Sequence, residues 1–332
     1  MRRSWTSVVL TSAVTGALAL AGCGGGDGGS AGAGATGTGG ASGDLTVVSV
    51  GAIPIVDVAP LYLGVEKGIF AGHGLQVEPF LAQGGAAIVP AVVTGQAQFG
   101  FSNITSLLQA EARGVPLALV APGSGATGDP KADFAAVIVR SDSPVQNAAD
   151  LAGRSVAINS INNISDTVVR EAVRQAGGDA GSVKFVELPF PNMVAAVADG
   201  SVDAAFTVEP FATVGKGQGM RAVASPYTQT DPDLTVAGYF TSDKYASQNP
   251  DAVKAFAAAM VESQQYATDH PDEARAVLSS YTQIQPDVAA ALTLPKYPTE
   301  IDRNSVAKLL DLGVKDGNVP DGVDLDKVFA DL

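Results

Sequence analysis

Short apolar runs alternate with helical patterns over most of the chain, and this alternation limits the possible folds more than any other feature. Strands are expected at residues 45–50, 75–79, 96–101, 117–121, 135–139, 155–159, 183–188, 202–208 and 237–241. After residue 249 the pattern becomes almost entirely helical. Strands that alternate with helices predict parallel or mixed sheets covered by helices, so the expected fold class is α/β.

The helices carry recognisable starts and stops. The clearest runs over residues 165–176 and stops at Gly177-Gly178. A later helix carries an apolar face that ends on a polar residue, formed by Val253, Phe256, Ala257, Met260, Val261 and Gln264. Pro90 follows Gly84-Gly85 within a third helical pattern. Because proline is tolerated only in the first turn of a helix, this helix is expected to begin near Ile88.

A weak internal repeat suggests two similar halves. Residues 91–101 match residues 196–206, and both segments have the pattern of a helix end, a glycine stop and an apolar strand. This correspondence predicts two α/β lobes, each with a strand that ends at a cleft.

The N-terminus has the features of an export signal. Arg2 and Arg3 precede an apolar run over residues 8–20, which is too short for a stable membrane span. The run closes on Leu20-Ala21-Gly22-Cys23, which resembles the lipobox of bacterial lipoproteins. Residues 1–22 are therefore expected to be a lipoprotein signal peptide, with Cys23 as the lipid anchor on the extracytoplasmic side of the cell membrane. The alternative is an ordinary secretory signal with an incidental cysteine.

Composition sets further limits. Residues 23–44 consist mostly of Gly, Ala, Ser and Thr, which predicts a flexible tether. Cys23 is the only cysteine, so disulfide bonds within the chain are excluded. The net charge of −14 argues against nucleic acid as a partner, because binding to phosphates needs a basic surface.

Four segments, in order along the chain, resemble the nitrate/sulfonate/taurine family of ABC-transporter substrate-binding proteins, which includes binders of thiamine-pyrimidine precursors. They are residues 59–78, residues 84–100, Asp150-Leu151-Ala152-Gly153-Arg154-Ser155-Val156-Ala157, and residues 193–211, which end in Glu209-Pro210-Phe211. One departure is Gln98, which stands where the family usually has Asp.

The resemblance implies a two-lobe periplasmic-binding-protein fold (type II), with hinged lobes and a ligand cleft between them. Lobe 1 is expected over residues 45–134 plus 237–332, and lobe 2 over residues 135–236. The implied partners are a small-molecule solute and the permease and ATPase subunits of an ABC importer. The family also implies a monomer, and no cofactor or metal is expected.

In α/β sheets, ligands bind beyond the carboxyl ends of strands. The segments expected there are residues 54–59, 83–86, 102–105, 160–166, 189–192 and 207–211. They supply the candidate ligand-binding residues Asp57, Gln83, Ser102, Asn103, Ser160, Asn163, Ser165, Asn192 and Glu209. None of these segments contains Lys or Arg, so a zwitterion or an amine fits better than a dianion. An acidic group of the ligand would meet the helix start at residues 160–165, and its amine would meet Glu209 or Asp57.

Several of these residues have a structural alternative. For Glu209 the alternatives are a cap of the following helix and one half of an inter-lobe ion pair. Asp57 is open to a role as a cap of the helix that carries Pro60, and helix capping is the ordinary role of a residue such as Ser165. Phe190 and Phe211 are candidates for stacking on a ring of the ligand or for the core.

The expected function is an extracytoplasmic lipoprotein that delivers a small polar organic nutrient to an ABC importer. Sulfonate-like or taurine-like solutes and aminopyrimidines both fit. A ligand-sensing or adhesive surface lipoprotein is the alternative, and an enzyme related to pyrimidine synthesis is a remote one. A non-enzyme is favoured because His73 and His270 lack partners at metal-ligand spacing, and because no Gly-x-Ser-x-Gly or Walker motif occurs after the Gly-rich segment that ends at residue 44.

Overall fold

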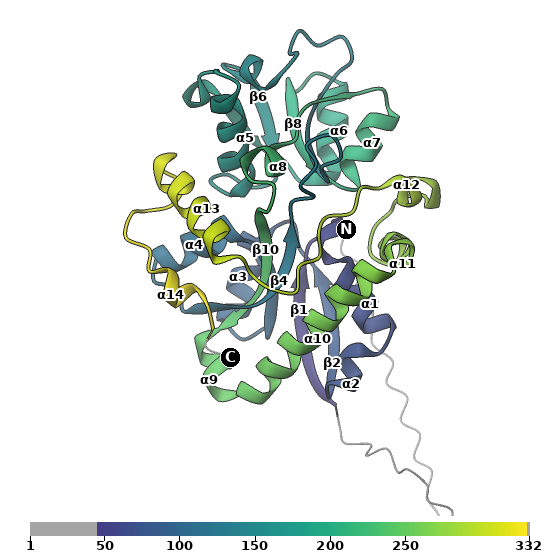
Figure 1. Ribbon diagram of the computed structural model, residues 1–332, viewed down its shortest axis with the longest axis vertical. Helices are drawn as coiled ribbons and strands as arrows, with labels where there is room; N and C mark the ends of the chain where they lie inside the picture. The colour runs from purple at the N-terminus through teal and green to yellow at the C-terminus, as the bar shows by residue number, and fades with distance from the viewer. Residues whose placement is uncertain (1–44, 331–332) are drawn as a thin grey trace, which may run out of the picture. The chain divides into compact units, whose positions relative to one another are not determined.

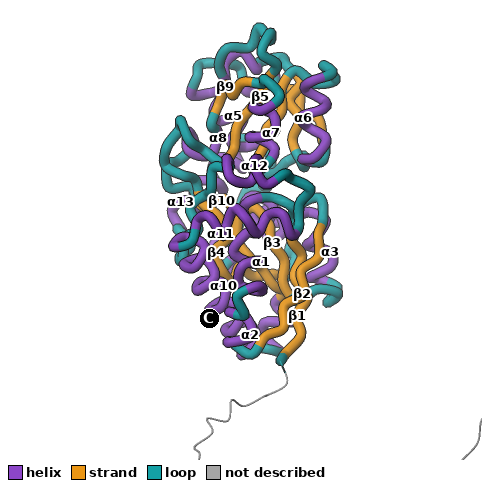
Figure 2. The backbone as a smooth tube through the Cα atoms, turned by 90° about the vertical axis from the view of Figure 1, so that its right-hand side faces the viewer, coloured by secondary structure: helices purple, strands orange, loops and turns teal. Residues whose placement is uncertain are grey.

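The computed structural model describes residues 45–330. The signal peptide, Cys23 and the tether, all expected from the sequence, lie outside the described residues. Two five-stranded sheets, each covered by helices, form two lobes (Figures 1 and 2). The first sheet has the order β2 (Leu75–Leu81), β1 (Thr46–Ala52), β3 (Phe99–Asn103), β10 (Thr235–Ser242), β4 (Leu117–Gly125). The second has the order β7 (Lys184–Glu187), β6 (Ser155–Ile158), β8 (Ala204–Val208), β5 (Ala135–Val139), β9 (Arg221–Ala224).

The two sheets share one topology. In the first, β1 pairs in parallel with β2 and β3, and β10 is antiparallel to β3 and β4. In the second, β6 pairs in parallel with β7 and β8, and β5 is antiparallel to β8 and β9. The α/β class is therefore confirmed, and the chain crosses between the lobes after β4 and again before β10. The residues at which each lobe begins and ends stay a prediction.

The helices follow the strands in both lobes. Lobe 1 carries η1 (Val56–Val58), α1 (Ala59–Glu66), α2 (Ile69–Gly72), α3 (Gly85–Val93) and α4 (Ile104–Ala112). Lobe 2 carries η2 (Ala148–Leu151), α5 (Ile164–Gln175), η3 (Ala180–Ser182), α6 (Phe190–Ala198), α7 (Phe211–Gly217) and α8 (Pro226–Thr230). The C-terminal region contributes α9 (Asp243–Gln248), α10 (Pro250–Asp269), α11 (Pro271–Ala276), η4 (Val277–Ser280), α12 (Pro286–Ala291), α13 (Arg303–Lys315) and α14 (Leu325–Val328).

The internal repeat corresponds to equivalent elements of the two lobes. Its first copy ends α3 and enters β3, and its second copy ends α6 and enters β8. Both helices have nine residues and both strands have five. Because β3 and β8 hold the third place in their sheets, the repeat reflects one strand position that occurs in each lobe.

One expectation about secondary structure is wrong, and one strand was not expected. Helix α3 begins at Gly85, not near Ile88, and Pro90 lies inside it on the exposed face. There the ring points to solvent, and the helix ends one turn later, where the backbone N–H of Thr94 donates to the Pro90 carbonyl at 3.0 Å. Strand β9 was not expected, because its four residues begin with Arg221 and are too short for a clear periodicity.

Helix α10 fastens the C-terminal region to the first sheet. The face predicted from the sequence is confirmed at Val253, Phe256, Met260 and Gln264, all of which are buried. The Phe256 ring stacks on Phe99 of β3, with ring centroids 3.8 Å apart and an interplanar angle of 7°. Aromatic contact of this kind adds to the free energy gained from burial, so the long helix is fixed on the sheet. Within residues 45–330, no helix is both long and apolar enough to span a bilayer.

Candidate functional site

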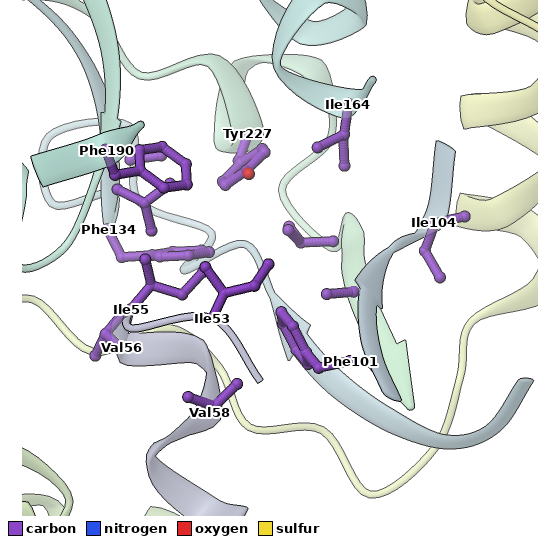
Figure 3. Packing of buried hydrophobic residues seen from close by; sticks show 14 of the residues in the cluster. Ile53, Ile55, Val56, Val58, Phe101, Ile104, Phe134, Ile164, Phe190 and Tyr227 are labelled. Atoms are coloured by element: carbon purple, nitrogen blue, oxygen red, sulfur yellow. The ribbon is translucent and has the colours of Figure 1, made fainter. Parts of the chain in front are cut away.

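A small cavity lies between the lobes at the carboxyl ends of strands from both sheets. Its polar lining consists of Asp57, Asn103, Asn159, Asn163, Ser165 and Tyr227. Its apolar lining includes Ile53, Ile55, Phe101, Phe190 and Val208, and Figure 3 shows how closely several of these pack. The volume is ≈ 20 Å³, which is room for about one water molecule. An organic solute would therefore enter this site by parting the lobes.

Asp57 is the most unusual residue of the cavity. It is 2% exposed, and its Oδ1 accepts a hydrogen bond of 2.5 Å from the Ser124 hydroxyl. Its Oδ2 is buried and has no hydrogen-bond partner in the structure. Burial raises the pKa of Asp57 to about 6, and the bond from Ser124 opposes this shift. An unpartnered carboxylate oxygen inside a protein is unfavourable, and a protonated amine would satisfy it.

The alternative role of Asp57, as a cap of the helix that carries Pro60, is not observed. Helix α1 begins at Ala59, and no side chain caps it. Asp57 instead occupies the preceding turn, η1, and points its carboxyl group toward β4. The carboxyl group of Asp57 therefore does not cap a helix.

A bulge in β4 brings Ser124 to Asp57. Ala237 of β10 pairs with Ser124 and the next residue pairs with Pro122, so Gly123 is the extra residue. A Cβ on Gly123 would lie 2.9 Å from the carbonyl carbon of Ala237, and this close approach requires glycine. The Gln264 side-chain N–H donates to the carbonyls of Pro122 and Gly123. The polar end of the α10 face thus holds the strand that orients Asp57.

Tyrosines fix the other side of Asp57. The hydroxyl of Tyr281 donates to the Ile55 carbonyl at 3.1 Å, and the hydroxyl of Tyr297 donates to the Val56 carbonyl at 3.0 Å. Burial, with the nearby Asp57 charge as a smaller cause, raises the pKa of both phenols well above their ordinary value. They therefore act as neutral donors that hold the backbone on which Asp57 sits.

Two helix N-termini also meet this cavity. Asn103 caps α4, with its Oδ1 accepting from the Ser106 N–H at 2.9 Å. Asn163 caps α5, with its Oδ1 accepting from the Ser165 N–H at 3.0 Å. Asn159 joins this group, because its Oδ1 accepts from the Asn163 amide and from the Ser165 hydroxyl. Helix N-termini favour a negatively charged group, so the cavity has an acidic side and a side suited to an anion.

Of the residues predicted for the site, Asp57, Asn103, Asn163 and Ser165 line this cavity. Gln83 lines a neighbouring cavity of ≈ 180 Å³. Ser102 is fully buried behind the start of α3, where its hydroxyl approaches Gly85, and it faces away from the cavity. Ser160 and Asn192 are not among the lining residues, and Asn192 is exposed.

Glu209 is buried but not in the cavity lining. Its Oε2 accepts from the Thr213 N–H at 3.0 Å, and its Oε1 accepts from the Thr213 hydroxyl at 2.8 Å. Burial raises the pKa of Glu209, and the bonds from Thr213 oppose the shift. The carboxyl group is therefore bonded to the first turn of α7, whose N-cap position is Pro210.

Phe190 and Phe211, both considered for stacking on a ligand, instead stack on each other. Their ring centroids are 6.2 Å apart and their planes differ by 6°. Phe190 nevertheless lines the cavity with one part of its side chain. Three polar residues at or next to the cavity were not predicted: Asn159, Ser124 and Tyr227. The sequence pattern would have allowed the prediction of Asn159 as a site residue, because it is a polar residue at the end of a predicted strand.

On one edge of the cleft the lobes are joined by a group of polar contacts, here called the polar clasp, formed by Gln109, Asp166, Arg174, Asp316 and Asn318. The Arg174 guanidinium donates to both Asp316 oxygens, at 2.6 and 3.2 Å. The Asn318 amide donates to Asp166 at 3.1 Å, and the Gln109 amide donates to the carbonyls of Asn162 and Asn318. Figure 1 shows the corresponding elements, with α13 beside α4 and α5.

No metal site accompanies the cavity. Nowhere among residues 45–330 do three or more His, Cys, Asp or Glu side chains gather so that they could hold a metal ion. The described lining of the cavity also contains no Lys, Arg or His. Apart from the weakly acidic phenol of Tyr227, Asp57 is thus the ionisable group of the lining, and a ligand would have to complement its negative charge.

Comparison with known proteins shows the family of this chain. The sequence model of the NMT1/THI5-like family matches residues 55–274. The taurine-binding periplasmic protein of Escherichia coli (strain K12) is 25% identical over 182 residues, which cover 54% of this chain and 54% of that protein. A putative binding protein of Brucella abortus (strain 2308) is 26% identical over 209 residues, or 60% of each chain. The chain therefore matches little more than half of the length of these curated relatives.

Solved structures share the fold over more of the chain. The alkanesulfonate-binding protein SsuA of Xanthomonas axonopodis pv. citri has a TM-score of 0.74 at 18% identity and covers 87% of this chain and 99% of its own. The nitrate-binding protein NrtA of Synechocystis PCC 6803 has a TM-score of 0.72 at 18% identity, with 86% of each chain covered. The desulfurization enzyme DSZB has a TM-score of 0.60 at 18% identity and covers 86% of this chain and 96% of its own. At these identities the likeness shows the fold, which is the expected two-lobe periplasmic-binding-protein fold.

Proposed function

This chain belongs to the NMT1/THI5-like family, and we propose that it is the solute-binding component of an ABC importer for an organic solute that carries an amine. The observation that carries this proposal is Asp57, a buried acid with an unpartnered oxygen at the inter-lobe cavity. Nitrate, sulfate or phosphate would meet no cationic side chain there, and a protonated amine would complete the hydrogen bonding of the acid.

A zwitterion suits the cavity better than a simple anion. Its ammonium would pair with Asp57, and its acidic group would lie at the N-termini of α4 and α5. The name of the taurine-binding relative supports this, because taurine is an aminosulfonate. Closing of the lobes around such a solute would be limited by the difference in its affinity for the open and closed forms.

Binding, not catalysis, is the role that we propose for this site. The fold also occurs in an enzyme, DSZB, so the fold alone does not decide the matter. The described lining residues, however, include one carboxyl group and no His, Lys or Cys. This set lacks a nucleophile paired with a base, which acyl-transfer chemistry requires. The function proposed here therefore rests on recognition of a solute.

The location and partners are part of the same proposal. The lipobox-like sequence Leu20-Ala21-Gly22-Cys23 supports cleavage before Cys23 and attachment of a lipid to it. The protein would then work as a monomer outside the cytoplasmic membrane and deliver its solute to permease and ATPase subunits. Labelling of growing cells with a radioactive fatty acid tests the anchor: the parent should incorporate the label and Cys23→Ser should not. An unlabelled parent, or equal labelling of the two proteins, would contradict the lipid anchor.

A matched set of three ligands tests the proposed ligand class. Taurine carries an amine and a sulfonate, ethylamine carries the amine alone, and ethanesulfonate carries the anion alone. Ligand at 100 times its dissociation constant should stabilise the protein by about 2.7 kcal/mol, which a thermal-shift assay detects readily. We expect shifts with taurine and ethylamine and none with ethanesulfonate. A shift with ethanesulfonate alone would overturn the assignment of an amine.

A further inference from the structure

A large apolar groove lies on the edge of the cleft opposite the polar clasp. Its volume is ≈ 640 Å³, and no charged side chain is among its described lining residues. The apolar walls include Leu81, Val194, Phe211, Val214, Ile284 and Val288. Sites for small organic molecules commonly have volumes of about 300–1,000 Å³ and mostly apolar walls with a few polar groups. The groove has those properties, and Gln218 and Gln283 supply neutral polar groups at its wall.

Both lobes build this groove. Val194 and Phe211 belong to helices α6 and α7 of lobe 2. Leu81 ends β2 of lobe 1, and Ile284 lies just before α12 of the C-terminal region. Figure 1 shows α12 beside α7, on the side of the molecule away from α13. A molecule in the groove would touch both lobes and would therefore favour their closed arrangement.

A third cavity lies between the groove and the Asp57 cavity and shares lining residues with both. This cavity of ≈ 180 Å³ shares Ile53 and Phe190 with the Asp57 cavity. It shares Pro54, Leu81 and Pro191 with the groove. The three cavities thus follow one another along one edge of the cleft, and the side chains of Ile53 and Phe190 form the partition next to Asp57. Figure 3 shows these two residues within one apolar cluster.

Exposed apolar residues gather at the outer end of this path. Leu81 is 47% exposed and its neighbour Phe80 is 36% exposed, both at the end of edge strand β2. Exposed apolar residues that adjoin a cavity mark surfaces that bind something. The opposite edge is closed by the charged contact of Arg174 with Asp316. A ligand that extends beyond the Asp57 cavity therefore has its apolar route on the Leu81 side.

We propose that the solute is an amphiphilic amine, whose ammonium group pairs with Asp57 and whose hydrocarbon chain passes between Ile53 and Phe190 into the apolar groove. This inference rests on the proposed function and names the class of its ligand. The occupant of the groove is the alkyl or aryl part of the same ligand, because the three cavities share lining residues from the buried acid to the surface. The chain takes the place between the two partition residues when the lobes close on it.

Calorimetric titration with a series of primary amines tests the proposal. The probes are propylamine, butylamine, hexylamine and 2-phenylethylamine, added to the mature chain from residue 23 with Cys23→Ser so that no acyl chain competes. Affinity should rise about three- to fourfold per buried methylene group, which makes hexylamine bind tens of times more tightly than propylamine. Hexanol, which has the chain without the charge, should bind at least tenfold more weakly than hexylamine.

Variants separate the groove from the acid. Leu81→Asp should weaken hexylamine at least tenfold more than it weakens propylamine, because the introduced charge would meet the hydrocarbon chain that propylamine lacks. Leu45→Asp is the matched control, since Leu45 is also exposed, at 40%, and lies outside the groove. Asp57→Asn should weaken every amine of the series alike.

Each failure has its own meaning. Equal affinity for propylamine and hexylamine would overturn the groove assignment and leave the amine at Asp57 standing. Equal binding of hexanol and hexylamine, insensitive to Asp57→Asn, would also overturn it, because the groove would then act without the acid. No binding of any amine, with a shift for another ligand of the matched set, would overturn the proposed ligand class and this inference together.

Discussion

The two edges of the inter-lobe cleft are built from opposite chemistry. The polar clasp joins the lobes through Arg174, Asp316 and Asn318, whereas the groove edge brings together apolar residues such as Leu81 and Phe211. Charged and amide contacts have strict geometry, so the clasp fixes how the lobes meet, although desolvation leaves such pairs with little net stability. Apolar contacts impose no such geometry, and the proposed ligand would enter at this apolar edge. Under the proposed function, the orientation of the lobes and the recognition of a solute therefore belong to different edges of the cleft.

Breaking the clasp should cause the largest loss of stability. Asp316→Ala leaves the Arg174 guanidinium, which is 21% exposed, with Glu171 as its remaining acidic partner. Removal of one member of a buried ion pair costs about 3 kcal/mol, and we expect that loss in the free energy of unfolding. Because the contact joins the lobes, the radius of gyration measured by small-angle X-ray scattering should also increase.

A control on the same helix sharpens this test. Asp311 lies in α13 and is exposed, so Asp311→Ala should change neither quantity. Equal effects of the two substitutions would mean that the clasp does not hold the lobes.

The second prediction concerns the acid that lies between the two edges. The folded protein raises the pKa of Asp57 from 3.8 to about 6, so the neutral form is favoured on folding. The resulting stability is complete below pH 3.8 and is lost as the pH rises toward about 6. Asp57→Asn removes that pH-dependent loss. The free energy of unfolding of the variant minus that of the parent should therefore be about 3 kcal/mol larger at pH 7 than at pH 3.5.

Denaturant unfolding of the two proteins at both pH values measures this difference. The expected result is a gain in stability together with a loss of amine binding. The unpaired buried carboxylate destabilises the folded protein, but it is the group that pairs with the ammonium of the ligand. A difference in stability that does not change with pH would contradict the burial of a charged Asp57.

The third prediction concerns the element that holds Asp57 in place. Gln264→Leu removes the donor for the carbonyls of Pro122 and Gly123, which should lower the free energy of unfolding by about 2 kcal/mol. Relaxation of the bulge would also move Ser124 from Asp57 and weaken amine binding. The neighbouring residue offers a control, because Gln265 is exposed and bonds to Asp269 on its own helix. Gln265→Leu should leave both stability and binding unchanged, and equal losses in the two variants would exclude a special role of Gln264.

The smallest effect on stability is expected on the groove edge. Leu81→Asp changes an exposed side chain, so the free energy of unfolding should stay within about 0.5 kcal/mol of the parent. Chemical denaturation measures this value alongside the hexylamine titration. Loss of stability as large as that from Asp316→Ala would show that the apolar edge, too, holds the lobes together.

Much of the fold was predictable because periodicity acts locally. Apolar runs located every strand except β9, and the helix over residues 165–176 lies within one residue of α5 at each end. The start of α3 was wrong because an exposed face can accept Pro90, and exposure of that face is set by packing that the sequence does not show. Local signals therefore recover elements but not their environment.

The candidate site was less predictable, for a reason that Ser102 and Asn103 illustrate. They are neighbours on β3, and successive side chains of a strand point to opposite faces. Asn103 reaches the cavity and Ser102 faces α3, so a strand end known from sequence does not reveal which residue is presented to a ligand. Ser124 was missed because its position depends on a bulge held by Gln264, more than a hundred residues further along the chain.

The most direct test of the central claim compares two buried acids by calorimetric titration at pH 7 with taurine and hexylamine. Asp57→Asn should weaken both ligands about a hundredfold, because the ammonium loses its buried charged partner. Glu209→Gln should leave both affinities within a few-fold of the parent, since Thr213 already occupies that carboxyl group. Unchanged binding in Asp57→Asn, or a greater loss in Glu209→Gln, would contradict the assignment of Asp57 as the partner of the amine.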